Sequence, residues 1–475
     1  MAAITAKKQL SLLKNVLRFF MRNTYKNEAL WCVKITQNMV EFANSNMLAG
    51  VMVPDTGVPL DREVYVSYDI LQSALAINAA NLNVVFTEQH RIWNINGVVC
   101  DAIDKSSTAF RDADSFLQGK SFVLDVPLPP WALLDDLRLA EGCQDIRHYL
   151  NGTFFDVANR TVVCTDGHRL HSANSATLPE YRVDQLRSLV TREKDEQLDE
   201  YERRVQLLRG FIVDRTMMDL MKKMSCDSLR VTSSVEDNLR YVSGSGVLGY
   251  VTGQTINGVY PDHKRVCKTK TAIDLHDEHI RQQATPESIA QKQESHDRLS
   301  KRLEEVCLSL REMHHDDPEY FPLRAQRDEL LLEVRESQRK LDNVIKNVPA
   351  VQVSKTIKLH DGAAEQLSIF VKAVKAYKPR YPGVVIDFQK KAIVSSAMSV
   401  DSWGAIPLEI PFDHLSGELP ENALRVGVNA AYLADAIAAI PDGLVYIGSD
   451  LSEMAGVTIY DPSYVRCARV MSMRI

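Results

Sequence analysis

Apolar and polar positions along this 475-residue chain follow one order of elements three times. Each round opens with a segment in which apolar residues recur every three or four positions, as on one face of a helix. Short segments of alternating apolar and polar residues follow, as in half-buried strands. A second helical segment and further strands complete each round. The pattern predicts an α+β protein of three similar domains, at residues 1–123, 124–269 and 354–475.

Helical periodicity predicts two helices in each domain. They are expected at about residues 6–22, 67–79, 130–142, 211–224, 361–377 and 428–440. Alternation with β-branched and aromatic residues predicts the strands between them. These are expected at residues 29–35, 39–43, 84–86, 91–94, 152–156, 161–165, 228–231, 241–243, 384–388, 392–396, 445–448 and 457–460.

Two inserted segments interrupt this order. Residues 181–208 are strongly charged and predict a helical insert within the second domain. Residues 270–353 predict an antiparallel helical hairpin of coiled-coil type, because two runs of apolar residues with 3–4 spacing flank a break at His314 to Pro318. Thr285 is the expected N-cap, with Pro286 at the first helical position. Each arm of about 26 residues would reach about 40 Å. The spaced residues are Ile289, Leu299, Leu303, Val306, Leu310 and Met313, then Leu323, Leu330, Val334, Leu341, Val344 and Val348.

Composition narrows the class of protein. Apolar residues make up 45% and charged residues 25%, as in soluble globular proteins. The net charge of −6 excludes a wholly basic protein that coats nucleic acid. The eight cysteines are scattered without a C-x-x-C pair, which indicates neither a zinc site nor a disulfide framework. No apolar run has membrane-spanning length. We expect a soluble, cytoplasmic protein with no metal and no cofactor.

Basic residues gather on one helix of each domain. They are Lys7, Lys8, Lys14, Arg18 and Arg22; Arg215, Lys222 and Lys223; and Lys372, Lys375 and Lys378. From the residues alone, an ordinary solvated helix face and a surface that contacts phosphates non-specifically are equally good interpretations.

Candidate catalytic residues are few. Asp166, His168 and His171 lie within six residues, but positions 168 and 171 of a strand point to opposite faces, and no Ser or Cys is placed to complete a relay. We therefore expect no enzyme; the catalytic alternative is a hydrolase or nuclease built around Asp166 and His168. The cluster His314, His315, Asp316 and Asp317 is compatible with a metal site, although a polar turn at the hairpin tip is the commoner role of such residues. Ser243 to Gly246 lacks the context of a phosphate-binding loop.

Four short motifs carry a more specific signal. They are Asp145-Ile-Arg-His-Tyr-Leu-Asn-Gly152, Thr161-Val-Val-Cys-Thr-Asp-Gly-His-Arg-Leu170, Tyr260-Pro-Asp-His-Lys-Arg-Val266 and Met471-Ser-Met-Arg-Ile475. Their set and order resemble the bacterial-type sliding clamp, the beta subunit of DNA polymerase III. Members of that family carry YLNG, TDGHRL, FPD-x-RRV and MPMRL segments in this order. The inserted hairpin and the divergence of the first 120 residues resemble a clamp encoded by a large phage or mobile element.

The resemblance implies a DNA-clamp fold and a ring of two head-to-tail subunits that encircles double-stranded DNA without reading its sequence. The ring performs no chemistry. It tethers the replicative DNA polymerase and is placed on DNA by a clamp loader, and other replication and repair proteins dock through short peptides in a pocket at the junction of the last two domains. The pocket residues implied here are Leu150, Thr165, Gly167, His168, Arg169, Leu170, Pro261, Arg265, Val266, Met454, Gly456, Met471, Met473 and Arg474.

The resemblance also implies a DNA-contacting loop just before the YLNG segment. Gln, Arg, His and Tyr side chains there suit contacts to phosphate and sugar that leave a clamp free to slide. The DNA-binding residues implied are Gln144, Arg147, His148 and Tyr149 in the loop, and Arg22, Arg215, Lys222, Lys223 and Lys372 on the basic helices.

The sequence departs from the family at two places. Ser472 replaces the proline of the MPMRL tail, and Lys375 and Ala376 stand where clamps carry bulky aliphatic residues at the subunit interface. The second difference favours one alternative: a clamp-like adaptor that keeps the peptide pocket, does not encircle DNA and recruits host replication proteins.

Overall fold

The computed structural model describes most of the chain. The described residues are 6–23, 32–78, 80–87, 92–108, 110–111, 116–117, 122–174, 187, 191–192, 198–232, 240–266, 278, 285–313, 319–346, 355–376, 383–395, 400–401, 404–416, 425–441, 443–447, 456–463 and 465–473.

These residues form two compact units. The first unit comprises Met1–Gly167 and Ser172–Pro261, and the second comprises His168–His171 and Asp262–Ile475. The first unit thus holds the first predicted domain and most of the second, and the predicted boundary at residue 123 falls inside strand β8 (Phe122–Pro127). The division into three domains stays a prediction.

The first unit contains helices, strands and short 3-10 turns. In chain order they are α1 (Ala6–Asn23), β1 (Cys32–Ile35), β2 (Met39–Ala43), β3 (Met47–Met52), β4 (Val64–Ser67), α2 (Tyr68–Ile77), β5 (Val84–Thr87), β6 (Ile92–Ile95), β7 (Val98–Cys100), η2 (Lys105–Ser107), β8, α4 (Trp131–Arg138), η3 (His148–Leu150), β9 (Gly152–Asp156), β10 (Thr161–Thr165), β11 (Arg169–Ala173), α6 (Leu198–Val205), η4 (Gln206–Arg209), β12 (Phe211–Asp214), α7 (Arg215–Met224), β13 (Ser228–Thr232), β14 (Tyr241–Gly246) and β15 (Gly249–Gln254). The first three residues of β11, up to His171, and the preceding His168 belong to the second unit.

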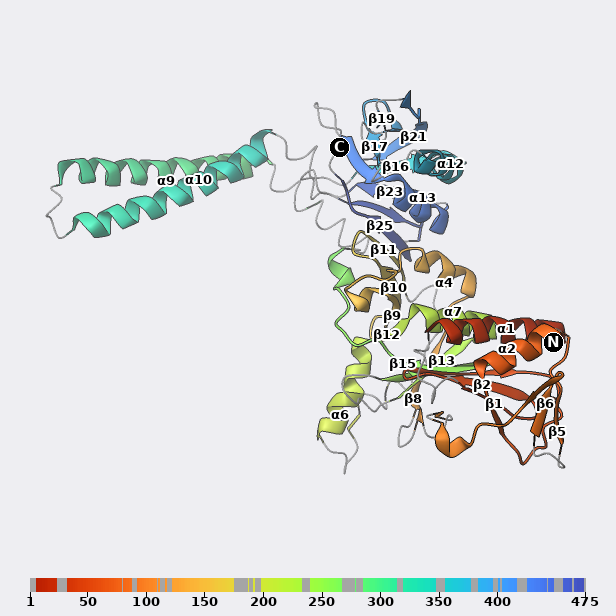
Figure 1. Cartoon of the computed structure of the whole chain (residues 1–475). Helices are drawn as coiled ribbons and strands as arrows, with labels where there is room; N and C mark the ends of the chain where they lie inside the picture. Colours follow the sequence, from red (N-terminus) through yellow and green to blue (C-terminus); the bar gives the residue numbers. More distant parts are fainter. Residues whose placement is uncertain are drawn as a thin grey trace. The chain divides into compact units, whose positions relative to one another are not determined.

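An antiparallel eight-stranded sheet organises the first unit, in the order β4-β1-β2-β3-β15-β14-β13-β8. The pairing of β15 with β3, in which Val251 lies opposite Ala49, joins its two halves. Helices α1 and α2 pack on the strands of one half and α7 packs on β14 and β15, on one side of the sheet (Figure 1). α1 turns a continuous apolar face to the core, with Leu10, Leu13, Val16, Leu17 and Phe20 buried.

The second unit contains the remaining elements. They are η5 (His263–Arg265), α9 (Pro286–Glu312), α10 (Tyr320–Lys346), β16 (Lys355–Leu359), α12 (Ala363–Ala376), β17 (Gly383–Asp387), β18 (Ala392–Ser395), β19 (Val400–Asp401), β20 (Gly404–Ala405), β21 (Glu409–Ser416), β22 (Arg425–Asn429), α13 (Ala430–Ala439), β23 (Leu444–Ile447), β24 (Val457–Tyr460) and β25 (Arg466–Val470). Its main strands run in the order β25-β24-β23-β16-β21-β18-β17-β22. α12 and α13 pack on each other and share one core with these strands.

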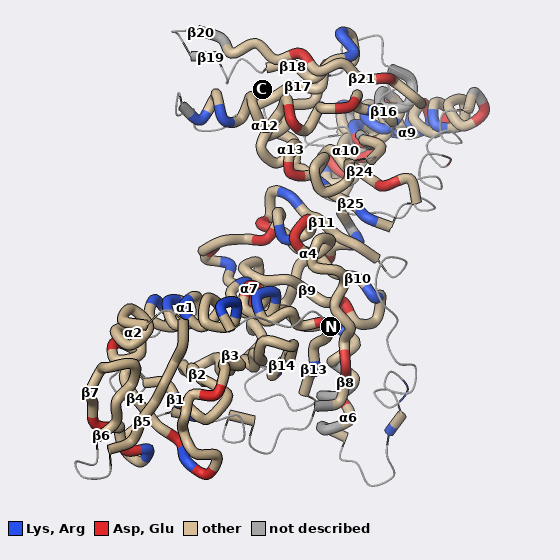
Figure 2. The backbone as a smooth tube through the Cα atoms, turned by 90° about the vertical axis from the view of Figure 1, so that its right-hand side faces the viewer, with Lys and Arg blue, Asp and Glu red and all other residues tan. Residues whose placement is uncertain are grey.

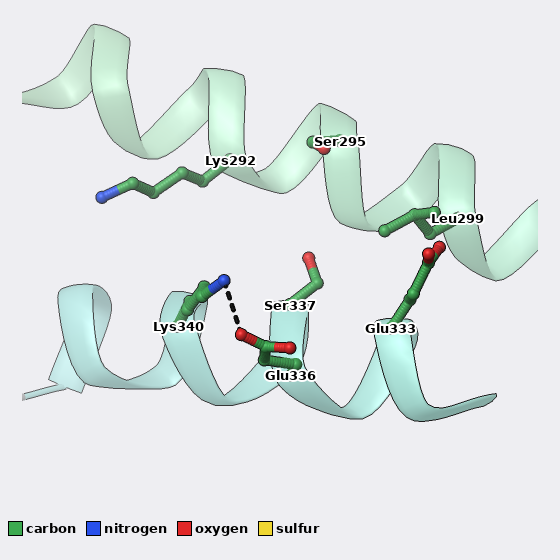
Figure 3. A pocket seen from close by; sticks show the side chains of 7 residues that line it. All are labelled: Lys292, Ser295, Leu299, Glu333, Glu336, Ser337 and Lys340. Carbon is green, nitrogen blue, oxygen red and sulfur yellow. Dashed lines mark ion pairs between the residues drawn. The ribbon is translucent and has the colours of Figure 1, made fainter. Parts of the chain in front are cut away.

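Helices α9 and α10 occupy the predicted hairpin and lie antiparallel (Figure 1). Thr285 is the N-cap as expected, because its side chain accepts a hydrogen bond from the Ser288 amide, and Pro286 follows it. Leu330 and Leu341 are buried between the arms. Small Ser295 and Ser337 leave a hollow of about 310 Å³ between the arms (Figure 3). Supercoiling of the arms stays a prediction.

Several sequence expectations need correction at their ends. The helix expected at 211–224 begins only at Arg215: residues 211–214 form β12, and the Asp214 side chain caps α7 by accepting from the Thr216 amide. The helix expected to reach residue 142 ends at Arg138. By contrast, the predicted strands at 39–43, 152–156, 161–165 and 457–460 match β2, β9, β10 and β24 to the residue. The tetrad at 314–317 lies outside the described residues, as does most of the charged insert apart from α6 and η4.

Candidate functional site

One histidine lies at the turn before β11 and is exposed, and a second lies on β11 and is buried. The Thr165 hydroxyl accepts a hydrogen bond from the Gly167 amide (3.0 Å), and Gly167 has a positive φ of +86° that favours glycine. His168 is exposed, whereas His171 is 1% exposed. The two side chains therefore differ in environment as the alternation predicts.

His168 and Arg169 meet the first turns of α13. Asn429 caps this helix by accepting from the amides of Ala431 and Tyr432. The ring of Tyr432 stacks on His168, with centroids 6.5 Å apart, and the Arg169 guanidinium lies 4.4 Å from the centre of the same ring. Arg169 also forms an ion pair with Asp435, one helical turn further along. An aromatic ring thus holds two potential hydrogen-bond donors side by side.

The C-terminal tail completes this arrangement. The Met471 amide donates to the His168 carbonyl (2.9 Å), and the Met473 amide donates to the Gly427 carbonyl on β22 (2.8 Å). Between them, Ser472 bridges Val428. The turn, the tail and the start of α13 therefore meet within the second unit. We call His168, Arg169, Tyr432, Met471 and Met473 the tail–turn surface.

Two further expected pocket residues meet at Arg469. Its Nη1 donates to the carbonyl of Val266 (3.0 Å). A Cβ on Gly456 would lie 2.8 Å from its Nε and 2.9 Å from the carbonyl oxygen of Val470, so a larger residue would displace the arginine or the backbone of β25. Arg469 therefore holds the segment that carries Val266 and passes close to Gly456.

Most of the other expected pocket residues lie in the first unit or outside the described residues, and Leu170 lies in the second unit. Leu150 and Thr165 are buried, and Gly167 and Pro261 are exposed. Leu170, on β11, is buried at 5% exposure. Met454, Arg474 and the side chain of Arg265 lie outside the described residues. Their membership of a peptide pocket stays a prediction.

The loop expected to contact DNA is a closed structure. The Asp145 amide donates to Asn151 Oδ1 (2.9 Å), and Asn151 Nδ2 donates to the Asp145 carbonyl (2.8 Å). Gln144 adopts a positive φ of +57°. Gln144, Arg147 and His148 are exposed, while Tyr149 is half-buried against Gly258. The loop thus presents polar side chains on a fixed backbone.

The basic helices differ in the exposure and ion pairing of their Lys and Arg side chains. α1 carries five cations and no acidic residue (Figure 2). None of these cations is buried, and Arg22 is exposed. On α7, Lys222 pairs with Asp135, while Lys223 is exposed. Arg215 is half-buried beside the buried Glu141, 3.8 Å away, so it ties the start of α7 to the segment that follows α4. Lys372 is exposed on α12.

Sequence patterns did not identify Tyr432, Asp435 or Arg469. The one available signal was local: Asn429 before an apolar run is a good N-cap, which places Tyr432 in the first turn of a helix. Nothing in the sequence pairs that turn with His168, more than 260 residues earlier.

Comparison with known proteins bears on the fold of the chain. No protein-family model and no curated protein sequence matches the chain. Among solved structures, it is similar to a DNA polymerase sliding clamp from Pseudomonas aeruginosa (13% identity, TM-score 0.57, 99% of each chain covered). It is also similar to the sliding clamp of Bartonella birtlesii bound to griselimycin (13%, 0.58, 99% of each chain) and to the DNA polymerase beta subunit of Streptococcus pyogenes (11%, 0.56, 98% of each).

The chain has the sliding-clamp fold. The α+β class and the clamp architecture expected from the sequence are thereby confirmed. At this level of identity the likeness establishes the fold alone. Among the helices that the structure describes, none combines the length and the apolar character that a membrane crossing requires.

Proposed function

We propose that this chain is a DNA sliding clamp: a non-catalytic protein that encircles duplex DNA as a ring of two subunits and tethers a replicative polymerase and other replication proteins. A clamp loader would place it on DNA. The observation that carries the proposal is a sliding-clamp fold over at least 98% of the chain, combined with the meeting of the TDGHRL turn and the C-terminal tail.

The tail–turn surface suits a short peptide. Met471 is 45% exposed and Met473 is half-buried, and the flexible thioether side chain adapts to differently shaped apolar partners. His168 and Arg169 stand beside them as donors for the peptide's carbonyl or carboxylate groups. An apolar anchor beside fixed polar groups is the usual composition of such sites.

Weak contacts suffice for DNA if the ring holds it by topology. The exposed cations of α1, with no acidic neighbour on that helix, provide an attraction to phosphate without sequence preference. This explains how a chain of net charge −6 can act on DNA. The tethered polymerase gains effective concentration at the primer end.

Retention on circular DNA tests the ring. After long incubation with a nicked plasmid at low salt, the protein should stay on the circle when the salt is raised and leave once the plasmid is cut. The same plasmid linearised beforehand is the matched control. Equal loss from circle and line would overturn encirclement.

Peptide selection tests the tail–turn surface. Peptides selected on the full chain from a random-sequence library should include ones that no longer bind after deletion of Met471–Ile475. Melting of the deletion variant must remain close to that of the full chain, because the tail adds little to the buried core. If every selected peptide binds the deletion variant equally well, the tail–turn surface is not the docking site.

One observation favours the adaptor as a second candidate. Lys375 is exposed in the last turn of α12, the helix whose end carries apolar interface residues in the resembling family. A charged residue there weakens an apolar subunit contact. Such an adaptor would keep the tail–turn surface and bind its peptides, but would leave circular and linear DNA equally fast.

A further inference from the structure

Arg147 joins two segments that the proposed function treats separately. Its guanidinium forms a bidentate ion pair with the Asp145 carboxylate: Nε donates to Oδ1 (3.1 Å) and Nη2 donates to Oδ2 (2.8 Å). Nη2 also donates to the backbone carbonyl of Asp166 (3.1 Å). Asp145 belongs to the loop expected to face DNA, and Asp166 belongs to the turn that continues into His168. One side chain therefore ties the loop to the turn.

The turn is shaped to receive this guanidinium. A Cβ on Gly167 would lie 2.7 Å from Nη1 and 2.8 Å from Nη2 of Arg147, closer than any real contact allows. Gly167 also has the positive φ that glycine tolerates. The arginine thus lies close to Gly167, immediately before His168.

The loop end of the link is fixed independently. The Asn151 side chain holds the backbone of Asp145 at both its amide and its carbonyl. The Arg147 amide adds a hydrogen bond to Asp145 Oδ1 (2.8 Å). Asp145 is therefore an anchored partner, and a bidentate arginine–carboxylate pair fixes the plane of the guanidinium as well as its position.

The pair lies near the surface, with 45% of the Arg147 side chain exposed and 21% of the Asp145 side chain. Ion pairs of this exposure contribute little to the stability of a fold. The main consequence of the arrangement is therefore geometric.

We propose that Arg147 is a positioning residue for the tail–turn surface: through Asp145 it holds the Asp166–Gly167 turn so that His168 and Arg169 reach Tyr432. It thereby makes the peptide-binding surface depend on the conformation of the loop expected to face DNA. The inference rests on the proposed function, since the effect is measured as peptide affinity.

The first test breaks the link from each end. Arg147→Ala and Asp145→Asn should each weaken binding of a selected, tail-dependent peptide about tenfold, within the range by which neighbouring residues couple. The double variant should lose no more than either single variant, because both remove the same link. Arg147→Lys should also weaken peptide binding, since an ammonium group cannot form the bidentate pair with the carboxylate.

A matched control separates this role from general loss of a surface pair. Arg230 also pairs with an aspartate, Asp125, at 3.6 Å, and is 58% exposed. Arg230→Ala should leave peptide affinity unchanged, and all the variants should melt close to the wild type. Wild-type affinity in Arg147→Ala, or additive losses in the double variant, would overturn the inference while leaving peptide binding by the wild type intact.

Salt dependence separates positioning from direct contact with DNA. If Arg147 neutralises a phosphate, Arg147→Ala lowers the slope of log affinity for DNA against log salt by about one. The positioning role predicts an unchanged slope together with weaker peptide binding. A reduced slope with unchanged peptide affinity would assign Arg147 to the DNA contact. If no tail-dependent peptide is found for the wild type, the proposed docking function itself fails.

Discussion

At the scale of single residues, the ring of Tyr432 is the centre of the tail–turn surface. It contacts His168 through one stacked ring and Arg169 through the guanidinium. Both contacts use the face of the ring and not the hydroxyl group. A cation over an aromatic ring contributes about 0.5–2 kcal/mol, more when it is shielded from water.

We therefore expect Tyr432→Ala and Tyr432→Phe to differ. Removing the ring should release His168 and Arg169 and weaken binding of a tail-dependent peptide about tenfold, since each 1.4 kcal/mol changes affinity tenfold. Tyr432→Phe keeps the ring and should bind within about twofold of the wild type. Fluorescence anisotropy with a labelled peptide measures both. Equal losses in the two variants would assign the effect to the hydroxyl group instead.

Cysteine reactivity provides a second prediction at this scale. Burial raises the pKa of Cys32 to about 11 and that of Cys226 to about 12, and it raises the pKa of Cys164 further. Cys143 is exposed beside the loop of residues 144–149. Because the thiolate is the reactive form, iodoacetamide at pH 8 should modify Cys143 well before the three buried thiols. Peptide mapping by mass spectrometry follows the order; early modification of Cys164 would contradict the burial.

At the scale of elements, the sequence predicts the bounds of helices and strands where these depend on local periodicity. Strands β2, β9, β10 and β24 were predicted to the residue, because alternation and turn residues bound them. The apolar residues of β12 precede those of α7 without a break, so periodicity alone predicts one helix over both; the Asp214 cap marks where α7 begins. The sequence pattern does not predict strand β8, because this strand is defined by pairing with β13, about a hundred residues further along the chain.

The candidate site divides in the same way. His168, Arg169, Met471 and Met473 lie in short motifs that resemble a known family, so the sequence alone names them as candidates. Tyr432 was not found, since its part in the surface depends on where α13 packs. Propensity and spacing carry no information about such a long-range contact.

The hairpin offers a prediction on one element. Leu330 is 4% exposed between α9 and α10, whereas Leu332, two residues away on the same helix, is 65% exposed. Leu330→Ala should remove buried apolar contact, at a cost of about 2–5 kcal/mol where the site cannot collapse. Helices α9 and α10 pack mainly on each other. Because losing this buried contact weakens their main packing, we expect local opening of the hairpin.

Hydrogen exchange with mass spectrometry measures this opening. Amides of α9 and α10 should exchange faster in Leu330→Ala, while those of the eight-stranded sheet should not change. Leu332→Ala is the matched control and should exchange as the wild type does, since its side chain already faces water. Faster exchange throughout the chain in Leu330→Ala would show that the hairpin supports the whole fold.

At the scale of the whole molecule, the net charge is negative, but one helix carries only positive charges. The chain has 62 acidic and 56 basic side chains, yet α1 carries cations only. A protein that holds DNA by closing around it needs no excess of positive charge, because topology replaces tight binding. Sliding requires contacts that stay weak and independent of sequence. The acidic total and the basic helix are thus compatible with one function, provided that the ring closes.

Closure of the two-subunit ring depends on the subunit contact, and the exposed Lys375 at the end of α12 would weaken an apolar contact there. Light scattering at micromolar concentration decides it. For a two-subunit ring we expect a mass near 107 kDa, twice the 53.5 kDa of one chain. If the lysine weakens the subunit contact, Lys375→Leu should shift the equilibrium further toward the dimer, because it replaces a charge by apolar area. A mass near 53.5 kDa for both proteins at every concentration would contradict an unaided ring and favour the adaptor.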